Sequence, residues 1–433
     1  MAWKLRQSPR LGKLWLTDTQ NAGLASLGTP CPVKADWKAP FYIRHWCDQE
    51  QINLIIVGPE GPLAEGAADA MSAPGRAVFG PVQAGAQIEA DKAFAKQLMR
   101  QAAIPTAEAR IFDQYEPARA FVMSRDLPCV VKASGLAAGK GVVVCNDGND
   151  ALAALDRMMV QQEFGEAGLK VVVEEKLSGP EVSLLALVDG RTIWILDSAQ
   201  DHKRVGEGDR GPNTGGMGAY SPTTLLNEKT LSIIEREIFV PTVDALRREG
   251  IEYRGVLYAG LMLTPGGPRV LEFNCRFGDP ECQALLPRIK GDLVEICWAT
   301  ATGGLANIDL SFDRRACCCV VVCSEGYPGS IETGRAISGL DEAQASAELG
   351  EEVILFHAGT KRSGQEVVTA GGRVIGVTAL APTLAAAQAA VNRAAACVQF
   401  KGAFFRRDIG SAAVTANEAP RVRAAPAEMK RPH

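Results

Sequence analysis

Apolar runs alternate with segments of helical periodicity in the N-terminal part of the chain. Residues 51–58 (QINLIIVG) form an apolar run that ends in glycine, which predicts a buried parallel strand. A helix is expected at 64–71, a second strand at 77–79 and an amphipathic helix at 89–101. This order of elements is typical of a doubly wound α/β unit.

A mixed pattern of strands and helices begins at about residue 111. The hairpin expected at 182–196 turns at Asp189 and Gly190, and a β-rich unit is expected from residue 316 onward. The other expected elements are strands at 127–132, 142–145, 169–176, 255–263 and 269–273, and helices at 150–162, 227–249 and 384–398. The chain is therefore predicted to combine an α/β unit with α+β units.

Length and charge limit the class of protein. The 433 residues predict two to four domains, at roughly 100–200 residues per domain. The formal net charge is -4 and Lys and Arg form no long stripe, so we expect no nucleic-acid partner. The longest apolar stretches are shorter than a bilayer span, so we expect no membrane association. Residues 421–433 are rich in Pro, Ala and basic side chains, which predicts a disordered tail.

The chain has 12 cysteines, and Cys317, Cys318 and Cys319 are adjacent within an apolar run. Adjacent strand residues point to opposite faces, so these three thiols cannot ligate one metal together. The sequence also lacks a C-x-x-C pair, which favours buried, reduced cysteines in a core strand. Reduced cysteines and the lack of a signal-peptide pattern indicate a cytoplasmic protein.

A glycine-rich segment, KASGLAAGKGV, spans residues 132–142 between two expected strands. Its small side chains leave backbone N–H groups free to surround phosphate oxygens, and Lys132 and Lys140 add positive charge. It is not a Walker A loop, because Gly141 follows Lys140 where that loop has Ser or Thr. A glycine hairpin turn with a surface lysine is the alternative interpretation.

The segment VVVEEKLSGPEVS, residues 171–183, carries acidic side chains at the end of an apolar strand. Adenine needs donors and acceptors from a strand edge, and a ribose needs a carboxylate that accepts its hydroxyl protons. Glu174, Glu175 and Glu181 are therefore candidates for nucleotide binding. An acidic strand end at the surface is the alternative interpretation.

The segment VLEFNCRFGDPE, residues 270–281, places Glu272 and Asn274 at positions i and i+2 of a strand, on one face. One carboxylate and one amide oxygen suit a magnesium ion that bridges phosphates. Arg276 shares this face and could brace a transferring phosphoryl group. A solvent-facing polar strand is the alternative interpretation.

A long polar segment, DHKRVGEGDRGPNTGGMGAYSP, covers residues 201–222. It places charged side chains before a glycine-rich loop able to close over a ligand, and loops of this length are uncommon unless functional. His202 is a candidate proton carrier, although a structural role is the default for a lone histidine. Together with the three other segments, it indicates a condensation driven by ATP and a divalent metal.

These motifs resemble those of the ATP-grasp superfamily, and of its phosphoribosylamine–glycine ligase family in particular. The resemblance runs from Ala2 to about Gly410, in IVGPEGPL, KASGLAAGKGV, AQDHKRV, GPNTGGMGAYSP, LEFNCRFGDPE and FHAGTK. It implies a multidomain α/β and α+β fold. The implied parts are a Rossmann-like (pre-ATP-grasp) α/β domain at 1–90, an ATP-grasp domain at 91–315 with a lid at about 111–181, and a β-rich, rudiment hybrid-like C-terminal domain at 316–420.

The resemblance also implies a reaction of purine biosynthesis and roles for individual residues. A monomer would join glycine to 5-phosphoribosylamine through glycyl phosphate, using ATP and Mg²⁺ or Mn²⁺, with Arg276 and Lys140 in catalysis and Glu272 and Asn274 as metal ligands. The residues expected at ATP are Lys92, Lys132, Gly135, Gly139, Lys140, Gly141, Glu174, Glu175, Lys176, Leu177 and Glu181. Those expected at the two other substrates are Asn21, Gly23, Gly58, Pro59, Glu60, Asp201, His202, Lys203, Gly215, Gly216, Met217, Gly218 and Asp279.

The chain departs from the family pattern at its start. Family members begin with an apolar strand and a glycine turn, whereas this chain starts at Met1 inside the helix that follows them. Either the start was assigned too late or this copy is impaired, and the intact downstream motifs favour the first explanation. The alternative functions are therefore another ATP-grasp ligase, against which the GPNTGGMG loop argues, and a nucleotide-binding protein without turnover.

Overall fold

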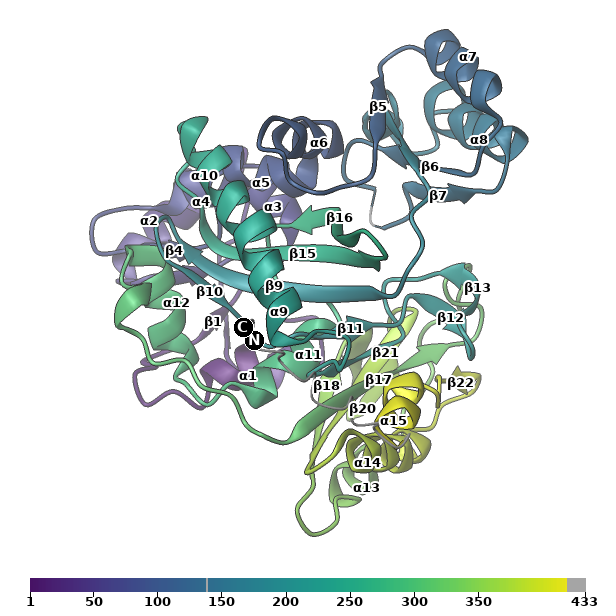
Figure 1. Cartoon of the computed structure of the whole chain (residues 1–433). Helices are drawn as coiled ribbons and strands as arrows, with labels where there is room; N and C mark the ends of the chain where they lie inside the picture. Colours follow the sequence, from purple (N-terminus) through teal and green to yellow (C-terminus); the bar gives the residue numbers. More distant parts are fainter. Residues whose placement is uncertain (138, 419–433) are drawn as a thin grey trace, which may run out of the picture.

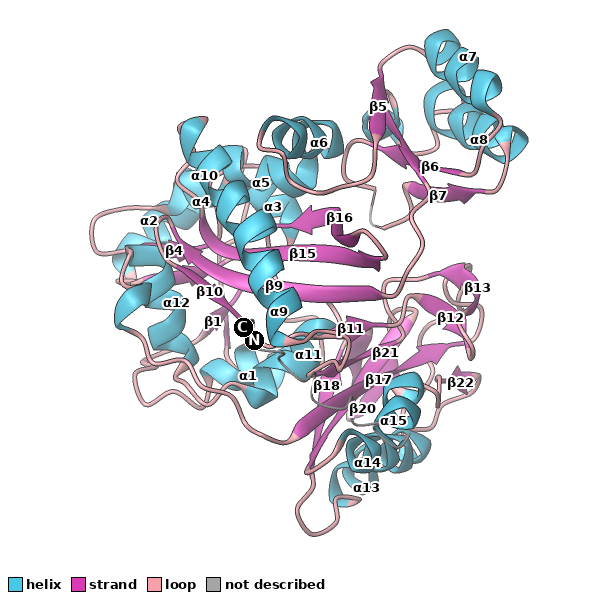
Figure 2. Cartoon of the chain, in the orientation of Figure 1, coloured by secondary structure: helices cyan, strands magenta, loops and turns pink. Residues whose placement is uncertain are grey.

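The computed structural model describes residues 1–137 and 139–418, which form four units, one of them built on a central antiparallel sheet (Figure 1). The N-terminal unit and the C-terminal unit flank this sheet, and a smaller lid projects from it (Figure 1). Helices and strands alternate in the N-terminal unit, whereas strands dominate the C-terminal one (Figure 2). The tail expected at 421–433 lies outside the described residues.

The N-terminal unit contains a parallel pair of strands, β3 (Leu54–Ile56) and β4 (Ala77–Phe79). The strand predicted at 77–79 is confirmed, and the one predicted at 51–58 is confirmed over a shorter range. The other elements are α1 (Ala2–Leu5), β1 (Trp15–Leu16), η1 (Leu24–Ser26), β2 (Thr29–Pro30), α2 (Phe41–Gln49), α3 (Glu60–Ala64), α4 (Ala67–Met71), α5 (Gln83–Ala90) and α6 (Lys92–Gln101).

Two helices of this unit were predicted wrongly as continuous. The segment 64–71 divides at Gly66, which has a left-handed φ of 86°. The segment 89–101 divides at Asp91, whose carboxylate accepts hydrogen bonds from the backbone N–H groups of Ala93 and Phe94 at 2.9 and 3.1 Å. An N-cap carboxylate starts a new helix, and the apolar periodicity continues across the break, so the pattern alone did not show it.

The lid is a four-stranded sheet in the order β5-β8-β6-β7, with α7 and α8 on its side away from the central sheet (Figure 1). The strands and helices predicted here are confirmed to within a few residues. Its elements are β5 (Ala109–Phe112), α7 (Tyr115–Arg125), β6 (Cys129–Ala133), β7 (Val142–Cys145), α8 (Gly148–Leu155) with its π-helical continuation η2 (Asp156–Val160), η3 (Gly165–Gly168) and β8 (Val171–Glu175).

The central sheet has the antiparallel order β10-β9-β15-β16, and the predicted hairpin at 182–196 is confirmed as β9 and β10. Its elements and covering helices are β9 (Glu181–Asp189), β10 (Ile193–Ile195), α9 (Glu228–Ile234), η4 (Glu235–Phe239), α10 (Val240–Arg248), β15 (Arg254–Thr264), β16 (Gly267–Asn274), α11 (Glu281–Leu285), η5 (Leu286–Arg288), α12 (Leu293–Thr302) and η6 (Leu305–Asn307). The register shifts by one residue at Leu271, because Gly260 pairs with Glu272 and Leu261 pairs with Val270. This bulge directly precedes Glu272.

The C-terminal unit is built on a sheet of order β11-β14-β17-β21-β18, with β22 also paired to β17. Cys317, Cys318 and Cys319 are fully buried in β17, so the prediction of a core strand is confirmed. The elements are β11 (Gln200–Asp201), β12 (Arg204–Gly206), β13 (Arg210–Asn213), β14 (Gly218–Ser221), β17 (Ala316–Ser324), α13 (Leu340–Ala345), β18 (Glu352–His357), β19 (Thr360–Ser363), β20 (Glu366–Thr369), β21 (Arg373–Ala381), α14 (Leu384–Cys397), β22 (Ala403–Phe404) and α15 (Ser411–Glu418).

The segment 201–222 connects the central unit to the C-terminal unit. Its strands β11 and β14 lie in the C-terminal sheet, so this segment links that sheet to the central one. Within residues 1–137 and 139–418, no helix is long and apolar enough to cross a bilayer.

Candidate active site

The end of strand β16 carries the two expected metal ligands. Asn274 is 9% exposed, and Glu272 lies 3.9 Å from the ammonium nitrogen of Lys203. Burial alone would raise the pKa of Glu272, but the charges of Lys203, Lys132 and other nearby cations lower it below its usual value. Glu272 is therefore an ionised carboxylate surrounded by cations, as a centre that binds phosphates and a metal requires.

The lid is joined to this strand end by Lys132. Its ammonium group donates a hydrogen bond to the backbone oxygen of Leu271 at 2.8 Å and lies 3.0 Å from a carboxylate oxygen of Glu174. The other oxygen of Glu174 lies 3.2 Å from the buried ammonium group of Lys96. One buried carboxylate thus holds two lysines between the lid and the central sheet.

The glycine-rich loop of the lid lies against the start of α6. The ammonium group of Lys92 donates to the backbone oxygen of Gly135 at 3.2 Å. A Cβ atom on Gly135 would lie 2.7 Å from the backbone of Ala167, so this position accepts only glycine. Lys140 is exposed and Gly139 has a left-handed φ of 74°, whereas Gly141 is buried. The structure brings Lys92 to the loop that was expected to cover the phosphates.

The side chains of the residues expected at the nucleoside are engaged in contacts with other protein groups. The side chain of Glu174 is used by two lysines, and Glu175 accepts a hydrogen bond from the backbone of Glu108 at 2.9 Å. Lys176 donates to Asn146 at 3.3 Å, and Leu177 follows it with a half-buried side chain. The backbone of Glu174 and Glu175 is paired with neighbouring strands as well, so Lys176 and Leu177, which follow the end of β8, are the candidates for a backbone edge that faces a base.

Lys203 connects the ribose candidate to the metal candidate. Its ammonium group lies 3.6 Å from Glu181 and 3.9 Å from Glu272. Burial alone would lower the pKa of Lys203, but Glu272, Glu181 and Asp201 raise it, so the ammonium group stays charged. A small cavity between Glu181, Lys203 and Asp201 is also lined by Tyr258.

Asp201 and His202 are half-buried next to Lys203 in the chain, and one side-chain polar atom of each, Oδ1 of Asp201 and Nδ1 of His202, is fully buried. Burial raises the pKa of Asp201 well above its usual value, and the charge of Glu281 raises it further. Burial and the charge of Arg406 lower the pKa of His202 to about 4, so its ring is neutral. The backbone N–H of Gly410 donates to this ring at 3.4 Å, which supports the structural role given as the default for His202.

Arg276 lies between two carboxylates that come from the N-terminal part of the chain. Its guanidinium group lies 3.0 Å from Glu60, which directly follows Gly58 and Pro59, and 2.8 Å from Glu89. Glu89 also accepts a hydrogen bond from the backbone N–H of Cys275 at 2.7 Å. Sequence reasoning missed Glu89, although it is the one charged residue in the helix QAGAQIEA and this signal could have identified it.

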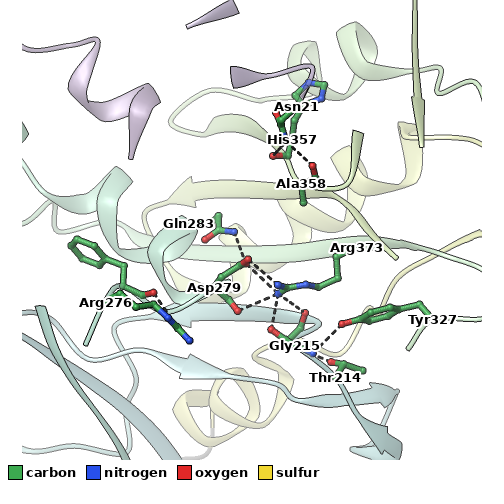
Figure 3. Close-up of polar contacts among 12 residues, drawn as sticks. Asn21, Thr214, Gly215, Arg276, Asp279, Gln283, Tyr327, His357, Ala358 and Arg373 are labelled. Atoms are coloured by element: carbon green, nitrogen blue, oxygen red, sulfur yellow. Dashed lines mark hydrogen bonds and ion pairs between the residues drawn. The ribbon is translucent and has the colours of Figure 1, made fainter. Parts of the chain in front are cut away.

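Asn21 contacts the C-terminal unit (Figure 3), and Gly23 lies close to His357 of the same unit. The amide group of Asn21 donates to the backbone oxygens of His357 and Ala358 at 3.1 and 2.6 Å. A cavity of about 290 Å³ lies beside this contact. Its lining residues are Thr19, Gln20, Ala22, Ala25, Lys361 and Arg362. The N-terminal loop therefore meets two cations that sequence reasoning did not identify.

In the glycine-rich loop that follows strand β13, some residues lie at the candidate site and others lie in the core of the C-terminal unit. Met217 is fully buried in the core of the C-terminal unit, and Gly218 is buried beside Cys319. Gly215 and Gly216 lie instead beside Asp279, to which Arg373 is bound (Figure 3). Arg373 had no role in the sequence-based site.

Models of three consecutive domains of phosphoribosylglycinamide synthetase match the chain. The N domain matches residues 1–89, the ATP-grasp (A) domain residues 90–282 and the C domain residues 317–412. The phosphoribosylamine–glycine ligase of Rhodopirellula baltica is 47% identical over 97% of this chain and 96% of its own length. The human trifunctional purine biosynthetic protein adenosine-3 is 44% identical over 97% of this chain, which spans 41% of that longer protein.

Solved structures agree with these matches. The crystal structure of phosphoribosylamine–glycine ligase from Thermotoga maritima has a TM-score of 0.79 and 29% identity, and the match covers 94% of this chain and 96% of that one. A biotin carboxylase from Campylobacter jejuni has a TM-score of 0.67 over 93% of this chain and 90% of its own, at 14% identity. The second match shows a shared fold alone.

Proposed function

Because the chain belongs to the phosphoribosylamine–glycine ligase family, it is an ATP-dependent carbon–nitrogen ligase, and we propose that it joins glycine to 5-phosphoribosylamine through glycyl phosphate. The products are glycinamide ribonucleotide, ADP and phosphate, in a step of purine biosynthesis. The observation that carries this proposal is the convergence of positive charge on Glu272: Lys203 lies 3.9 Å from its carboxylate, and the charges of Lys203, Lys132 and Lys92 all lower its pKa.

The first half-reaction needs charge neutralisation more than covalent catalysis. A carboxylate is a poor electrophile, so an oxygen of glycine attacks the γ-phosphorus of ATP and ADP leaves. Lys92 and Lys132 are placed to hold the phosphate oxygens, since both lie at the base of the glycine-rich loop. The buried pair formed by Lys132 and Glu174 keeps that ammonium group in position before ATP binds.

The second half-reaction forms the amide. The amine nitrogen of phosphoribosylamine attacks the carbonyl carbon of glycyl phosphate and loses a proton, while the carbon–oxygen bond to phosphate breaks and phosphate leaves. Arg276 is placed to neutralise the acyl phosphate, and Glu60 and Glu89 hold its guanidinium group in a fixed orientation. The phosphoribosyl group is assigned to the side of Asn21 and Gly23.

Glu272 and Asn274 fit the divalent metal that ATP-grasp ligases use with ATP. The carboxylate of Glu272 is ionised by its cationic neighbours, and Asn274 offers an amide oxygen two residues later on the same strand. We assign Mg²⁺ or Mn²⁺ to this pair, where the ion would supply positive charge to the phosphates. Among the described residues, there is no cluster of three or more His, Cys, Asp or Glu side chains that could hold a different ion.

The lid protects the intermediate. An acyl phosphate hydrolyses readily, so a closed lid that excludes water raises the yield of amide per ATP. Polar contacts of Lys132, Lys96 and Lys92 at the base of the lid would hold it against the central sheet in the closed position. A monomeric state and a cytoplasmic location complete the proposal.

A coupled assay tests this function. Purified chain is mixed with ATP, Mg²⁺, glycine and freshly prepared 5-phosphoribosylamine, and ADP and glycinamide ribonucleotide are measured. Formation of both products only when both substrates are present supports the proposal. ADP release with a different acid would indicate another ATP-grasp ligase, and ATP binding without any substrate-dependent turnover would indicate a nucleotide-binding protein.

A further inference from the structure

Arg373, the first residue of β21, donates three hydrogen bonds to Asp279 of the central unit (Figure 3). One guanidinium nitrogen donates to a carboxylate oxygen of Asp279 at 2.8 Å. The other donates to the second carboxylate oxygen at 3.2 Å and to the backbone oxygen of Asp279 at 3.1 Å. Bidentate geometry of this kind distinguishes the pair from an ordinary surface ion pair.

The same guanidinium group also holds the glycine-rich loop. It donates to the backbone oxygen of Gly215 at 2.6 Å and to that of Gly216 at 3.4 Å. The hydroxyl of Tyr327, also from the C-terminal unit, accepts a hydrogen bond from the N–H of Gly215 at 3.0 Å (Figure 3). Both polar groups of the Gly215 backbone are therefore fixed by one neighbouring unit.

The loop fits its surroundings only because its residues are glycines. A Cβ atom on Gly216, whose φ is 107°, would lie 2.3 Å from the ring of Pro280 and 2.8 Å from a carboxylate oxygen of Asp201. A Cβ atom on Gly215 would lie 3.1 Å from the guanidinium carbon of Arg373. The loop is thus held between Asp279–Pro280 on one side and Arg373 on the other.

The charge of this arrangement matters because the carboxylate of glycine and the phosphates of ATP are both negatively charged. A bare carboxylate at Asp279 would repel the carboxylate of glycine and the phosphate that is transferred to it. Burial alone would lower the pKa of Arg373, but Asp279 raises it above its usual value, so the guanidinium group is always charged and neutralises its partner. Lysine cannot reproduce this geometry, since it lacks the planar fork.

We propose that Arg373 is a positioning residue of the ligase reaction, which neutralises Asp279 and fixes the backbone of Gly215 and Gly216 where glycine is activated. This inference rests on the proposed function. It makes the C-terminal unit a contributor to the glycine end of the site, although its bonds end on protein atoms rather than on substrate. Removing the guanidinium group should weaken glycine use and leave ATP binding unchanged.

The test compares Arg373→Gln, Arg373→Lys, Asp279→Asn and the double variant Arg373→Gln/Asp279→Asn. We expect Arg373→Gln to lower kcat/KM for glycine on the order of 100-fold, mainly through KM, with ATP affinity unchanged within twofold. Asp279→Asn in the Arg373→Gln background should restore part of the loss, because it removes the unneutralised charge. Arg373→Lys keeps the positive charge but lacks the planar fork, so its kcat/KM for glycine should lie between those of Arg373→Gln and the parent chain.

Arg393→Gln is the matched control, since it breaks an ion pair of 2.6 Å between α14 and Glu351, the residue directly before β18, in the same unit. Strictly additive losses in the double variant, or normal glycine kinetics in Arg373→Gln, would overturn the inference. If Arg373→Gln fails to fold, Tyr327→Phe provides a milder test, with a severalfold rise in KM for glycine expected and an unchanged KM overturning it. If the parent chain itself has no ligase activity, the proposed function is contradicted, and this result is obtained before any variant is compared.

Discussion

The ammonium group of Lys132 donates a hydrogen bond of 2.8 Å to the backbone oxygen of Leu271. Leu271 is the bulged residue of β16 and directly precedes Glu272. A lysine of the lid therefore holds the strand backbone beside the metal candidate. This bond links the position of the lid to that of Glu272, the proposed metal ligand, so we expect a change in either to affect phosphate binding.

Replacement of Lys132 by Met should raise the KM for ATP by roughly 10-fold to 100-fold, because one charge-assisted contact to phosphate is lost. The variant also leaves Glu174 with Lys96 as its cationic partner, so the unfolding midpoint should fall. Steady-state kinetics and thermal unfolding with and without ATP measure the two effects. Lys229→Met, on the exposed face of α9, is the control. An unchanged KM for ATP would contradict the assignment of Lys132.

Replacement of Glu272 by Gln should reduce kcat by about 100-fold or more, since the ionised oxygen that holds the metal is lost. Binding of Mn²⁺ in the presence of ADP, followed by electron paramagnetic resonance, should weaken in parallel. Glu249→Gln, an exposed glutamate after α10, is the control. Near-normal turnover and Mn²⁺ affinity in the Glu272 variant would contradict the assignment of the metal to the end of strand β16.

Replacement of Gly23 by Ala should loosen the contact between the N-terminal loop and the C-terminal unit. The added Cβ atom would lie 2.7 Å from the Cβ atom of His357, and overpacking of this kind costs about 1–3 kcal/mol. We expect a higher KM for phosphoribosylamine with unchanged KM for ATP. Gly12→Ala is a matched control, because its Cβ atom would meet no atom within 4 Å. Equal effects of the two substitutions would refute a specific role for this contact.

The neutral, half-buried ring of His202 predicts that stability depends on pH between about 4 and 6.5. Burial and Arg406 lower its pKa in the folded chain from 6.5 to about 4, while Asp209 and Asp408 act in the opposite direction. The unfolded chain therefore binds more protons in this window, so the free energy of unfolding is complete above pH 6.5 and falls as the pH is lowered. Between neutral pH and pH 5 the loss is about 2 kcal/mol.

His202→Gln should flatten this decline, whatever its effect on stability at neutral pH. Urea unfolding at several pH values between 5 and 7 measures the slope, and His45→Gln, on the exposed face of α2, is the control. A variant that retains the full slope would show that another group titrates there, with His357 as the first candidate because burial lowers its pKa as well.

Features with a local signal could be predicted from the sequence. The strand Ala77–Phe79, the hairpin of β9 and β10 and the buried cysteines of β17 each follow from the alternation or length of apolar runs. Glu272 belongs to the same class, because a strand places residues i and i+2 on one face whatever the rest of the chain does. The helix break at Asp91 was missed, since a cap acts on backbone groups and leaves the apolar pattern unchanged.

Contacts between distant segments could not be predicted in this way. Arg373 and Asp279 are 94 positions apart, and Glu89 reaches Arg276 across 187 positions. Each of these side chains has an ordinary surface role as its simplest interpretation, and only the docking of separate units brings them together. The site is therefore predictable in its strand ends and loops, but not in the partners that hold those groups in place.

The hydrogen bonds of Asn21 can form only late in the synthesis of each molecule. Its partners His357 and Ala358 are 336 and 337 positions later, so at about 5–20 residues per second a ribosome needs roughly 17–70 s to supply them. During that interval the N-terminal loop has no docking surface and is open to chaperones and proteases. Formation of this contact, on the side that we propose for phosphoribosylamine, is thus timed by synthesis of the C-terminal unit rather than by the folding of the first unit.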